Sequence, residues 1–526
     1  MVILKFHLVE SKMPIVLVLC LLCGVVYAKH TLIMAVSENI GVMNPQGYQG
    51  NAMFAQNSIY EGLVSVDKQG KIIPCLALSW EISKDGLEYI FTLREGVKFA
   101  NGEDFNADAV VLNFQSVLKN KARHSWSGLV MALSSIEKIN PYKVSLKLKK
   151  PYSPTLNELS TPRPFRFLAP SAMPEDLDLI KHNPKPIGTG AYMLTQSVQG
   201  VSDTLVKNPL YWNKDTYKGI YYDEVILKVI FDPSSKLAAL RSGQIDLIYG
   251  YDQIPLEIFK SMQKSTQFNT YLSPPIRTLN LVINSSSPLF RLEDAKSSQT
   301  LRKALGYAIN KDKLNQAVYG EIQGAADCIF GHTQSCKSLD SSQKQEALTF
   351  LSSLSASNHS PLSGKSIEIL FRGDNPAYKM MAEIIQSDLK KQGIKAHLSA
   401  SEPTIYANRL LNGHFDMAFH ETWGAPYEPL SVLYSMLIPS HIDFAAQSGL
   451  ETKPLIDENI RKLIALSPSS QAFEALLTHI ISTLEQSGVY VPLSYQRNKA
   501  IAHKKLKGIT MGVLGYEVPF WEFYEE

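Results

Sequence analysis

The residues of this chain that could carry out chemistry rarely stand at the spacings that catalysis requires. The twelve histidines include no pair four residues apart. The sequence contains no His-Glu-x-x-His zinc helix, no Gly-x-Ser-x-Gly turn and no Gly-x-Gly-x-x-Gly fingerprint. Gly364-Lys365-Ser366 matches the end of a phosphate-binding loop, but His359 stands where the first glycine of that motif belongs. Many active sites have no local signature, yet these absences favour a binding protein over an enzyme.

The N-terminus predicts export from the cytoplasm. Two lysines precede an apolar stretch, residues 14–27, and the small residue Ala28 follows it, as at a signal peptidase site. The stretch is shorter than the ~20 residues that span a bilayer. Cys20 and Cys23 each follow a leucine, whereas lipid-modified cysteines normally follow a small residue. We therefore expect a periplasmic protein, cleaved near Ala28, without a lipid anchor.

The remaining cysteines fit an oxidising compartment with at most one disulfide bond. Cys328 and Cys336 would close a short loop, and we expect these two to pair. His332 between them completes a spacing that metal ligands also use, but we interpret it as a bystander. Cys75 lies in an apolar run and is expected to be a buried hydrophobic residue.

Length and charge limit the classes of function. A chain of 526 residues is too long for one core, so two or three domains are expected. The net charge is only +3, and no run of lysines and arginines occurs. Nucleic acid is therefore not an expected partner.

Short β-type runs alternate with amphipathic helices, which predicts a mixed α/β fold. Residues 338–363 are rich in serine and glutamine and are interpreted as a surface connection. The expected strands are 31–36, 89–93, 143–148, 224–230, 278–283, 366–371 and 416–420, and the expected helices are 107–118, 301–309, 377–392 and 471–487.

Several blocks, in an unchanged order, carry a family resemblance. They include Tyr60-Glu61-Gly62-Leu63, Pro74-Cys75-Leu76-Ala77-Leu78-Ser79-Trp80, Ser83-Lys84-Asp85-Gly86, Pro186-Ile187-Gly188-Thr189-Gly190, Gly243-Gln244-Ile245-Asp246-Leu247 and Arg302-Lys303-Ala304-Leu305. Over nearly all of the mature chain the sequence resembles the bacterial extracellular solute-binding proteins of the peptide and nickel importer class. The resemblance implies two lobes joined by a hinge, of the type with an extra small subdomain, and a ligand held between the lobes.

Five further stretches resemble the nickel-binding members of that class. They are Met53-Phe54-Ala55-Gln56, Arg123-His124-Ser125-Trp126, Pro162-Arg163-Pro164-Phe165-Arg166-Phe167, Thr422-Trp423-Gly424-Ala425-Pro426-Tyr427 and Pro439-Ser440-His441-Ile442-Asp443-Phe444. This resemblance implies that the cargo is nickel complexed by a small organic chelator. It also implies that His441 binds the metal, that Arg163 binds a chelator carboxylate, and that a set of other residues contacts the chelator: Tyr48, Met53, Arg123, Trp126, Trp423 and Tyr427.

The chemistry of these residue types agrees with that cargo. Nickel accepts imidazole nitrogen and carboxylate oxygen, but a single histidine cannot fill four to six coordination positions. A chelator would supply the missing ligands, and the planar fork of Arg163 can bind one of its carboxylates. Aromatic walls would exclude water and strengthen that contact.

Each of these residues also has a purely structural interpretation. Arg163 lies between two prolines and could form a structural ion pair, a role that suits Arg166 better. His441 follows Pro439-Ser440 in a loop where a lone histidine is ordinary, and tryptophans such as Trp126 belong to a core by default. His420 lies in an apolar run and is expected to be a core histidine whose hydrogen bonds are satisfied.

Other functions remain open at this point. An oligopeptide, haem or another metallophore could be the cargo, although Ala425 stands where peptide binders of this family carry an aspartate for the α-ammonium. A secreted hydrolase would need a nucleophile with a positioned base, and none can be nominated.

The expected organisation follows from the resemblance. Residues 1–28 form the signal peptide, 29–272 the first lobe with a small subdomain, 273–495 the second lobe, and 496–526 a return to the first lobe. We expect a monomer without a resident cofactor that docks on the membrane permease of an ABC importer.

Overall fold

The computed structural model describes residues 29–47, 53–213, 219–250, 253–330, 341–358, 360–422, 429–468, 470–515 and 517–526. The predicted signal peptide lies outside these ranges. Within them, every helix is too short or too polar to cross a membrane.

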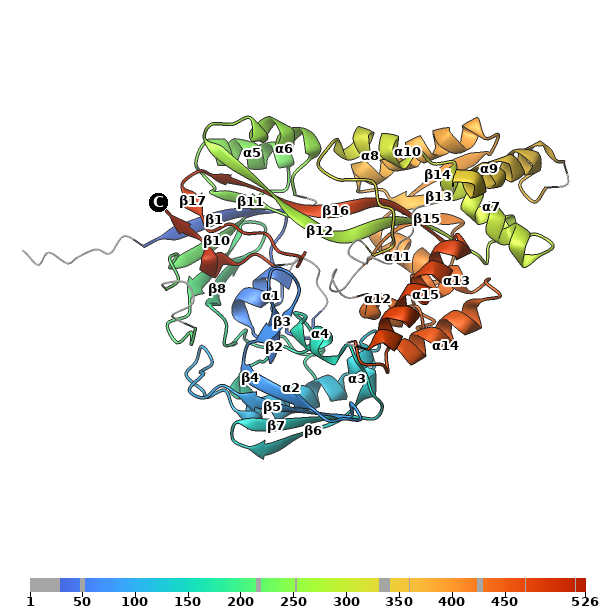
Figure 1. Cartoon of the computed structure of the whole chain (residues 1–526). Coiled ribbons are helices and arrows are strands. Elements are labelled where there is room, and N and C mark those ends of the chain that lie inside the picture. The colour runs from blue at the N-terminus through green and yellow to red at the C-terminus, as the bar shows by residue number, and fades with distance from the viewer. Residues whose placement is uncertain are drawn as a thin grey trace, which may run out of the picture.

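One mixed sheet runs through both halves of the molecule (Figure 1). Its strand order is β14-β13-β15-β12-β16-β11-β1-β10-β9-β8. The long strands β12 and β16 pair antiparallel along most of their length and belong to both halves. The strands are β1 (Thr31–Val36), β8 (Tyr192–Val198), β9 (Ser202–Lys207), β10 (Glu224–Val229), β11 (Leu247–Tyr249), β12 (Phe268–Ile283), β13 (Ile367–Arg372), β14 (Ala396–Ser401), β15 (Met417–Glu421) and β16 (Tyr490–His503).

The β12–β16 ladder is irregular where the sheet passes from one half to the other. Register shifts flank Pro275, which follows Pro274, because a proline has no N–H to donate to a ladder. The expected lobe boundaries at residues 272–273 and 495–496 fall at this irregularity. The boundaries themselves remain a prediction.

The first half combines its part of the sheet with short helices and a returning tail. Strand β1 pairs in parallel with β10 and β11, and α5 and α6 pack against this region through apolar residues such as Leu240 and Phe259. In the tail, Phe520 packs edge-on against Tyr192. The additional elements are α1 (Met53–Ile59), α5 (Pro233–Arg241), α6 (Leu256–Gln263), β17 (Leu506–Lys507), η4 (Phe520–Glu522) and β18 (Tyr524–Glu525).

A small subdomain lies below the first half in the view of Figure 1. Its antiparallel sheet has the order β4-β5-β7-β6 and is covered by α2, which Asn106 caps. Residues 83–86 form a turn in which Gly86 N–H donates to Ser83 O at 2.9 Å, and Gly86 has a φ of 70°, which only glycine adopts easily. The elements are β2 (Val64–Val66), β3 (Ile72–Pro74), β4 (Ala77–Ile82), β5 (Glu88–Leu93), α2 (Ala107–Lys119), α3 (Gly128–Ala132), β6 (Leu133–Asn140), β7 (Lys143–Leu148), α4 (Thr155–Ser160) and η2 (Pro170–Ala172).

The second half packs helices around β13, β14 and β15. Its core contains Leu281, Leu301, Ile369 and Ile385, and all four are fully buried. The elements are η3 (Pro288–Phe290), α7 (Ala295–Tyr307), α8 (Lys311–Tyr319), α9 (Ser341–Ala356), α10 (Pro376–Lys391), α11 (Pro403–Leu411), α12 (Leu430–Ser435), α13 (Ile442–Gln447), α14 (Lys453–Leu463) and α15 (Gln471–Ser487).

Two expectations from the sequence are corrected by the fold. The serine-rich segment 338–363 was interpreted as a surface connection, but α9 occupies much of it and packs on α7. Ala347 and Leu351 are buried there. Cys75 is half-buried and packs against the edge of the core, with its Sγ 3.8 Å from Glu61 Oε1, so it is less buried than expected.

The small subdomain contacts the second half directly. The rings of Tyr152 and Tyr434 meet edge to face with centroids 5.9 Å apart. The adjacent Ser153 N–H donates to Ile464 O at 2.8 Å. These contacts join the two halves on the side opposite the β12–β16 connection (Figure 1).

Candidate solute-binding site

Arg163 follows α4 in the first half of the molecule and is half-buried. Its Nη1 donates a hydrogen bond to Gly47 O at 2.9 Å, and its own carbonyl accepts one from Thr161 Oγ1 at 3.0 Å. Tyr48, which follows Gly47, lies outside the described residues. The guanidinium of Arg163 is therefore bonded to the backbone of the residue that precedes Tyr48, one of the predicted pocket residues.

A buried glutamine ties this segment to the turn that carries Arg123 and Trp126. Gln46 Nε2 donates to Ser116 Oγ at 2.9 Å, and Gln46 Oε1 lies 3.1 Å from His124 Nε2. Arg123 is exposed and Trp126 is half-buried on either side of His124. One scaffold thus connects the segment beside Arg163 with two further predicted residues.

The electrostatics of this scaffold favour a neutral histidine beside positive charge. Burial, and then repulsion from Arg123, lower the pKa of His124 to about 4. The buried imidazole is thus uncharged at neutral pH and serves as a hydrogen-bond partner of Gln46. Arg123 and Arg163 remain as cations near this scaffold, an arrangement suited to an anionic ligand.

Met53 is the first residue of α1 and is half-buried. The same helix is anchored to the segment before Tyr48, because Gln56 Nε2 donates to Asn44 O at 2.6 Å. Four predicted residues of the first half, Met53, Arg123, Trp126 and Arg163, therefore lie on elements that are held together by hydrogen bonds around residues 44–47.

The buried Glu158 on α4 organises the neighbouring elements. Its carboxylate accepts the N–H groups of Gly128 and Leu129 at the start of α3, at 3.2 and 3.1 Å, and the hydroxyls of Ser127 and Tyr152. Burial raises the pKa of Glu158, although these hydrogen bonds act in the opposite direction. This network joins the turn that contains Trp126 to Tyr152, which in turn contacts the second half of the molecule.

His441 is positioned at the start of α13 in the second half. Its Nδ1 lies 3.3 Å from the backbone N of Asp443 and 3.0 Å from the Asp443 carboxylate oxygen Oδ2. The side chain of His441 is 20% exposed, whereas that of Asp443 is 1% exposed. The imidazole is thus at the surface of the fold and its supporting carboxylate is inside it.

The structure brings His420 to the same carboxylate. His420, on β15, places Nε2 3.5 Å from Asp443 Oδ2, and the two imidazole centroids are 6.0 Å apart. The expectation that His420 is a satisfied core histidine is wrong, because its Nε2 is buried without a well-aligned hydrogen bond. Among the described residues, no group of three or more His, Cys, Asp or Glu side chains is arranged to hold a metal ion.

Asp443 is held from its other side by β16. Tyr490 OH donates to Asp443 Oδ1 at 2.8 Å, and Gln447 Nε2 donates to Tyr490 OH at 2.7 Å. Burial acts to raise the pKa of Asp443, but attraction to the nearby His420 and His441 outweighs it and holds that pKa well below its usual range. The carboxylate is ionised.

The predicted residues Trp423 and Tyr427 fall at positions outside the described ranges, directly after β15. Cys328 forms a disulfide bond, while Cys336, its predicted partner, also lies outside them. Arg166 is buried and its Nη2 donates to Ser160 O at 2.8 Å. This contact is structural, but it is a hydrogen bond to a carbonyl and not the ion pair expected from the sequence.

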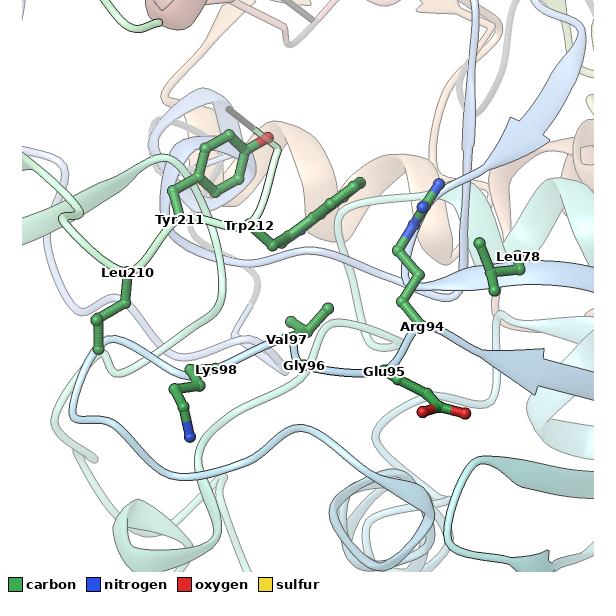
Figure 2. Close-up of a pocket in the computed structure, with 9 residues that line it drawn as sticks. All are labelled: Leu78, Arg94, Glu95, Gly96, Val97, Lys98, Leu210, Tyr211 and Trp212. Atoms are coloured by element: carbon green, nitrogen blue, oxygen red, sulfur yellow. The ribbon is translucent and has the colours of Figure 1, made fainter. Parts of the chain in front are cut away.

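A separate pocket of about 550 Å³ lies between the small subdomain and residues 210–212. Figure 2 shows Arg94 and Trp212 pointing toward one another in it, with the guanidinium carbon 4.3 Å from the ring centroid. Arg94 Nε also donates to Cys75 O at 2.5 Å. Of the predicted ligand-binding residues that the structure describes, none lines this pocket.

Sequence reasoning missed His124, Gln46 and the pairing of His420 with Asp443. The stretch of residues 123–126 contains His124, so a signal for its region was present. Nothing in the local sequence places His420 beside Asp443, because a strand and a helix start that are distant in the chain meet there.

The fold, the two halves and the polar residues on each define a class of protein. Residues 71–444 match the family model described as bacterial extracellular solute-binding proteins, family 5 Middle. The chain belongs to this family of solute-binding proteins.

Individual relatives within this family are similar to the chain over nearly its whole length. The chain is 37% identical over 501 residues to the nickel-binding periplasmic protein of Escherichia coli strain K12, covering 92% of each chain. The structure of NikA from Brucella suis, in complex with Fe(III)-EDTA, matches with a TM-score of 0.87 and 38% identity over 94% of this chain and 100% of that one. NikZ from Campylobacter jejuni, in complex with Ni(L-His), shares the fold with a TM-score of 0.76 and 23% identity, covering 95% of this chain and all of that one.

Proposed function

We propose that this chain captures nickel, as a complex with a small organic chelator, in the periplasm and delivers it to the membrane permease of an ABC importer. It acts as a monomeric carrier and not as an enzyme. The observation that carries this proposal is the 37% identity, over 92% of the chain, to a protein named for periplasmic nickel binding. The Brucella suis relative that holds Fe(III)-EDTA supports a metal bound together with an organic chelator.

The chemistry of the two halves supports the same cargo. His441 offers one imidazole, a good donor for nickel, from the second half. Arg163 and Arg123 offer positive charge from the first half, suited to the carboxylates of a chelator. In this proposal His441 binds the metal, and the chelator contacts Arg163, Arg123, Met53 and Trp126, with Tyr48, Trp423 and Tyr427 completing the pocket.

Native mass spectrometry of untagged protein tests the proposal. The protein is offered nickel alone, free L-histidine alone, the two together, and nickel with EDTA. We expect a mass increase equal to nickel plus chelator, and none for nickel alone. Retention of bare nickel would contradict the chelate, and retention of a peptide or haem from the expression host would redirect the assignment to those cargoes.

A further inference from the structure

The pocket between the small subdomain and residues 210–212 lies outside the proposed nickel site. Its volume of about 550 Å³ falls in the range of about 300–1,000 Å³ that is typical of small-molecule sites. Its walls come from β4, from the loop after β5 and from the segment after β9. A ligand in this pocket would therefore contact the small subdomain and the first half at once.

Arg94, the cation at the centre of this pocket wall, is held in place by the protein. Its Nε donates to Cys75 O at 2.5 Å, and its guanidinium carbon lies 4.3 Å from the ring centroid of Trp212 (Figure 2). Trp212 is fixed in turn, because its Nε1 donates to Glu61 Oε2 at 2.9 Å. A side chain that is already held in place loses little freedom when it binds a ligand.

The two Nη nitrogens of Arg94 are available to a ligand. Neither makes a hydrogen bond or an ion pair with any residue that the structure describes, and neither is enclosed by the protein. The planar edge of a guanidinium offers two parallel N–H groups, which match the two oxygens of a carboxylate. The pocket therefore contains a preformed site for one carboxylate.

The other charged side chains around the pocket leave this site to Arg94. Lys98 also lines the pocket, but its Nζ is paired with Asp104 Oδ1 at 2.6 Å. Glu95 is exposed, and Figure 2 shows its carboxylate pointing away from the Arg94 guanidinium. Among the described lining residues, Arg94 is thus the cation that is not already paired with a carboxylate.

The remaining walls are largely apolar. Leu78 and Leu210 are 47% and 38% exposed, and they line the pocket together with Val97 and the ring of Trp212. Single exposed leucines are ordinary on a protein surface, but here two of them belong to one pocket. One unpaired cation among apolar walls suits a ligand with one negative charge and an apolar part. A polyanion such as inorganic phosphate would lose hydration there without a matching positive charge.

We propose that this pocket binds a small molecule in which one carboxylate is joined to an apolar group. The carboxylate accepts hydrogen bonds from the Nη nitrogens of Arg94, and the apolar group packs against Leu78, Val97 and Leu210. None of the described residues assigned to the nickel complex lines this pocket. The inference is therefore independent of the proposed nickel cargo, and either can fail without the other.

Fluorine NMR of the full chain labelled with fluorotryptophan tests the site directly. The chain has five tryptophans, and the Trp212 signal is identified by its absence from Trp212→Phe. The probe is hexanoate, and hexanamide is a neutral molecule of the same shape. We expect hexanoate to shift the Trp212 signal saturably and to bind at least about 10-fold more tightly than hexanamide, because hydrogen bonds to charged groups are the stronger ones.

A change at the pocket wall and a matched control locate the binding. Leu78→Glu adds a carboxylate to the wall that Arg94 shares and should weaken hexanoate binding by about 10-fold or more. Leu455→Glu changes a leucine of α14 that is 49% exposed and lies far from the pocket in the chain, and it should bind hexanoate as the native protein does. Arg94→Gln removes the fork and should cause the same loss as Leu78→Glu.

Three results would overturn the proposal. The first is a Trp212 signal that hexanoate does not shift saturably, including the case in which only other tryptophan signals move. The second is equal affinity for hexanoate and hexanamide. The third is equal hexanoate binding by Leu78→Glu and Leu455→Glu.

Discussion

At the scale of single residues, the proposed binding chemistry is divided between the two halves of the molecule. His441 lies at the start of α13 beside a buried carboxylate, and Arg163 lies after α4, bonded to Gly47. To bind a metal complex whose chelator carries carboxylate groups, a protein needs a suitable donor atom for the metal and a cation for the carboxylates. Neither residue alone would distinguish such a complex from a free anion or a free metal ion.

The arginine gives the first prediction. Arg163→Lys keeps the positive charge but loses the planar fork and the bond to Gly47 O. We expect the affinity for nickel offered with L-histidine or with EDTA to fall roughly 10-fold or more, since hydrogen bonds to charged groups contribute about 1.5–3 kcal/mol. Isothermal titration calorimetry measures the change. Arg372→Lys, in an exposed ion pair with Asp374, is the control, and an equal affinity for both variants would argue against a ligand role for Arg163.

At the scale of elements, many helices and strands were predictable because their apolar residues follow the period of a helix or a strand. Strands β1 and β7 and helix α15 have the predicted bounds. Helix α9 was missed because its serine and glutamine content resembles a linker, although residues 347, 350, 351 and 354 form an apolar helical face. Composition was given more weight there than periodicity.

The site was less predictable than the elements. The local stretches around Arg163 and His441 could be recognised in the sequence, because each is a run of neighbouring residues. The approach of His420 to Asp443 depends on how β15 packs beside α13, and the anchoring of Arg163 depends on a carbonyl group. Neither contact leaves a pattern of residue types along the chain.

The returning tail gives a prediction at this scale. Removal from water, followed by repulsion from Glu522, raises the pKa of Glu517 from 4.5 to about 7, against the attraction of Arg166 and Lys68. The folded protein therefore binds more protons than the unfolded chain between pH 4.5 and 7, so this residue's contribution to stability falls as the pH rises through that window.

Glu517→Gln removes that contribution. The stability of the variant relative to the native protein should rise by about 3 kcal/mol between pH 4.5 and 7 and then remain constant. Denaturant unfolding at a series of pH values measures it, with the exposed Glu38→Gln as control. A difference that does not depend on pH would show that Glu517 titrates normally.

At the scale of the whole molecule, the two halves are joined by the continuous sheet on one side and by the Tyr152–Tyr434 contact on the other. A ligand between the halves would favour the conformation in which this contact is formed. The contact is small, and an aromatic pair of this kind contributes about 0.5–1.5 kcal/mol. The Tyr152–Tyr434 contact is therefore strong enough to delay the release of a ligand but too weak to prevent it.

Tyr434→Ala should speed dissociation of the nickel complex by about 3- to 10-fold, as expected for the loss of one aromatic pair. Tyr434→Phe keeps the ring and should release the complex at nearly the native rate. Stopped-flow measurement of release into excess chelator compares the variants. Equal rates for Ala and Phe would show that the contact does not control release.

The central claim is that nickel is held by His441 of this protein together with a separate organic chelator. Diffraction data collected at the nickel edge from crystals grown with nickel and L-histidine test this claim most directly. We predict one anomalous peak, bonded to an imidazole nitrogen of His441, with the remaining nickel ligands in non-protein density that reaches Arg163. A nickel peak away from His441, or one surrounded only by protein side chains, would contradict the account.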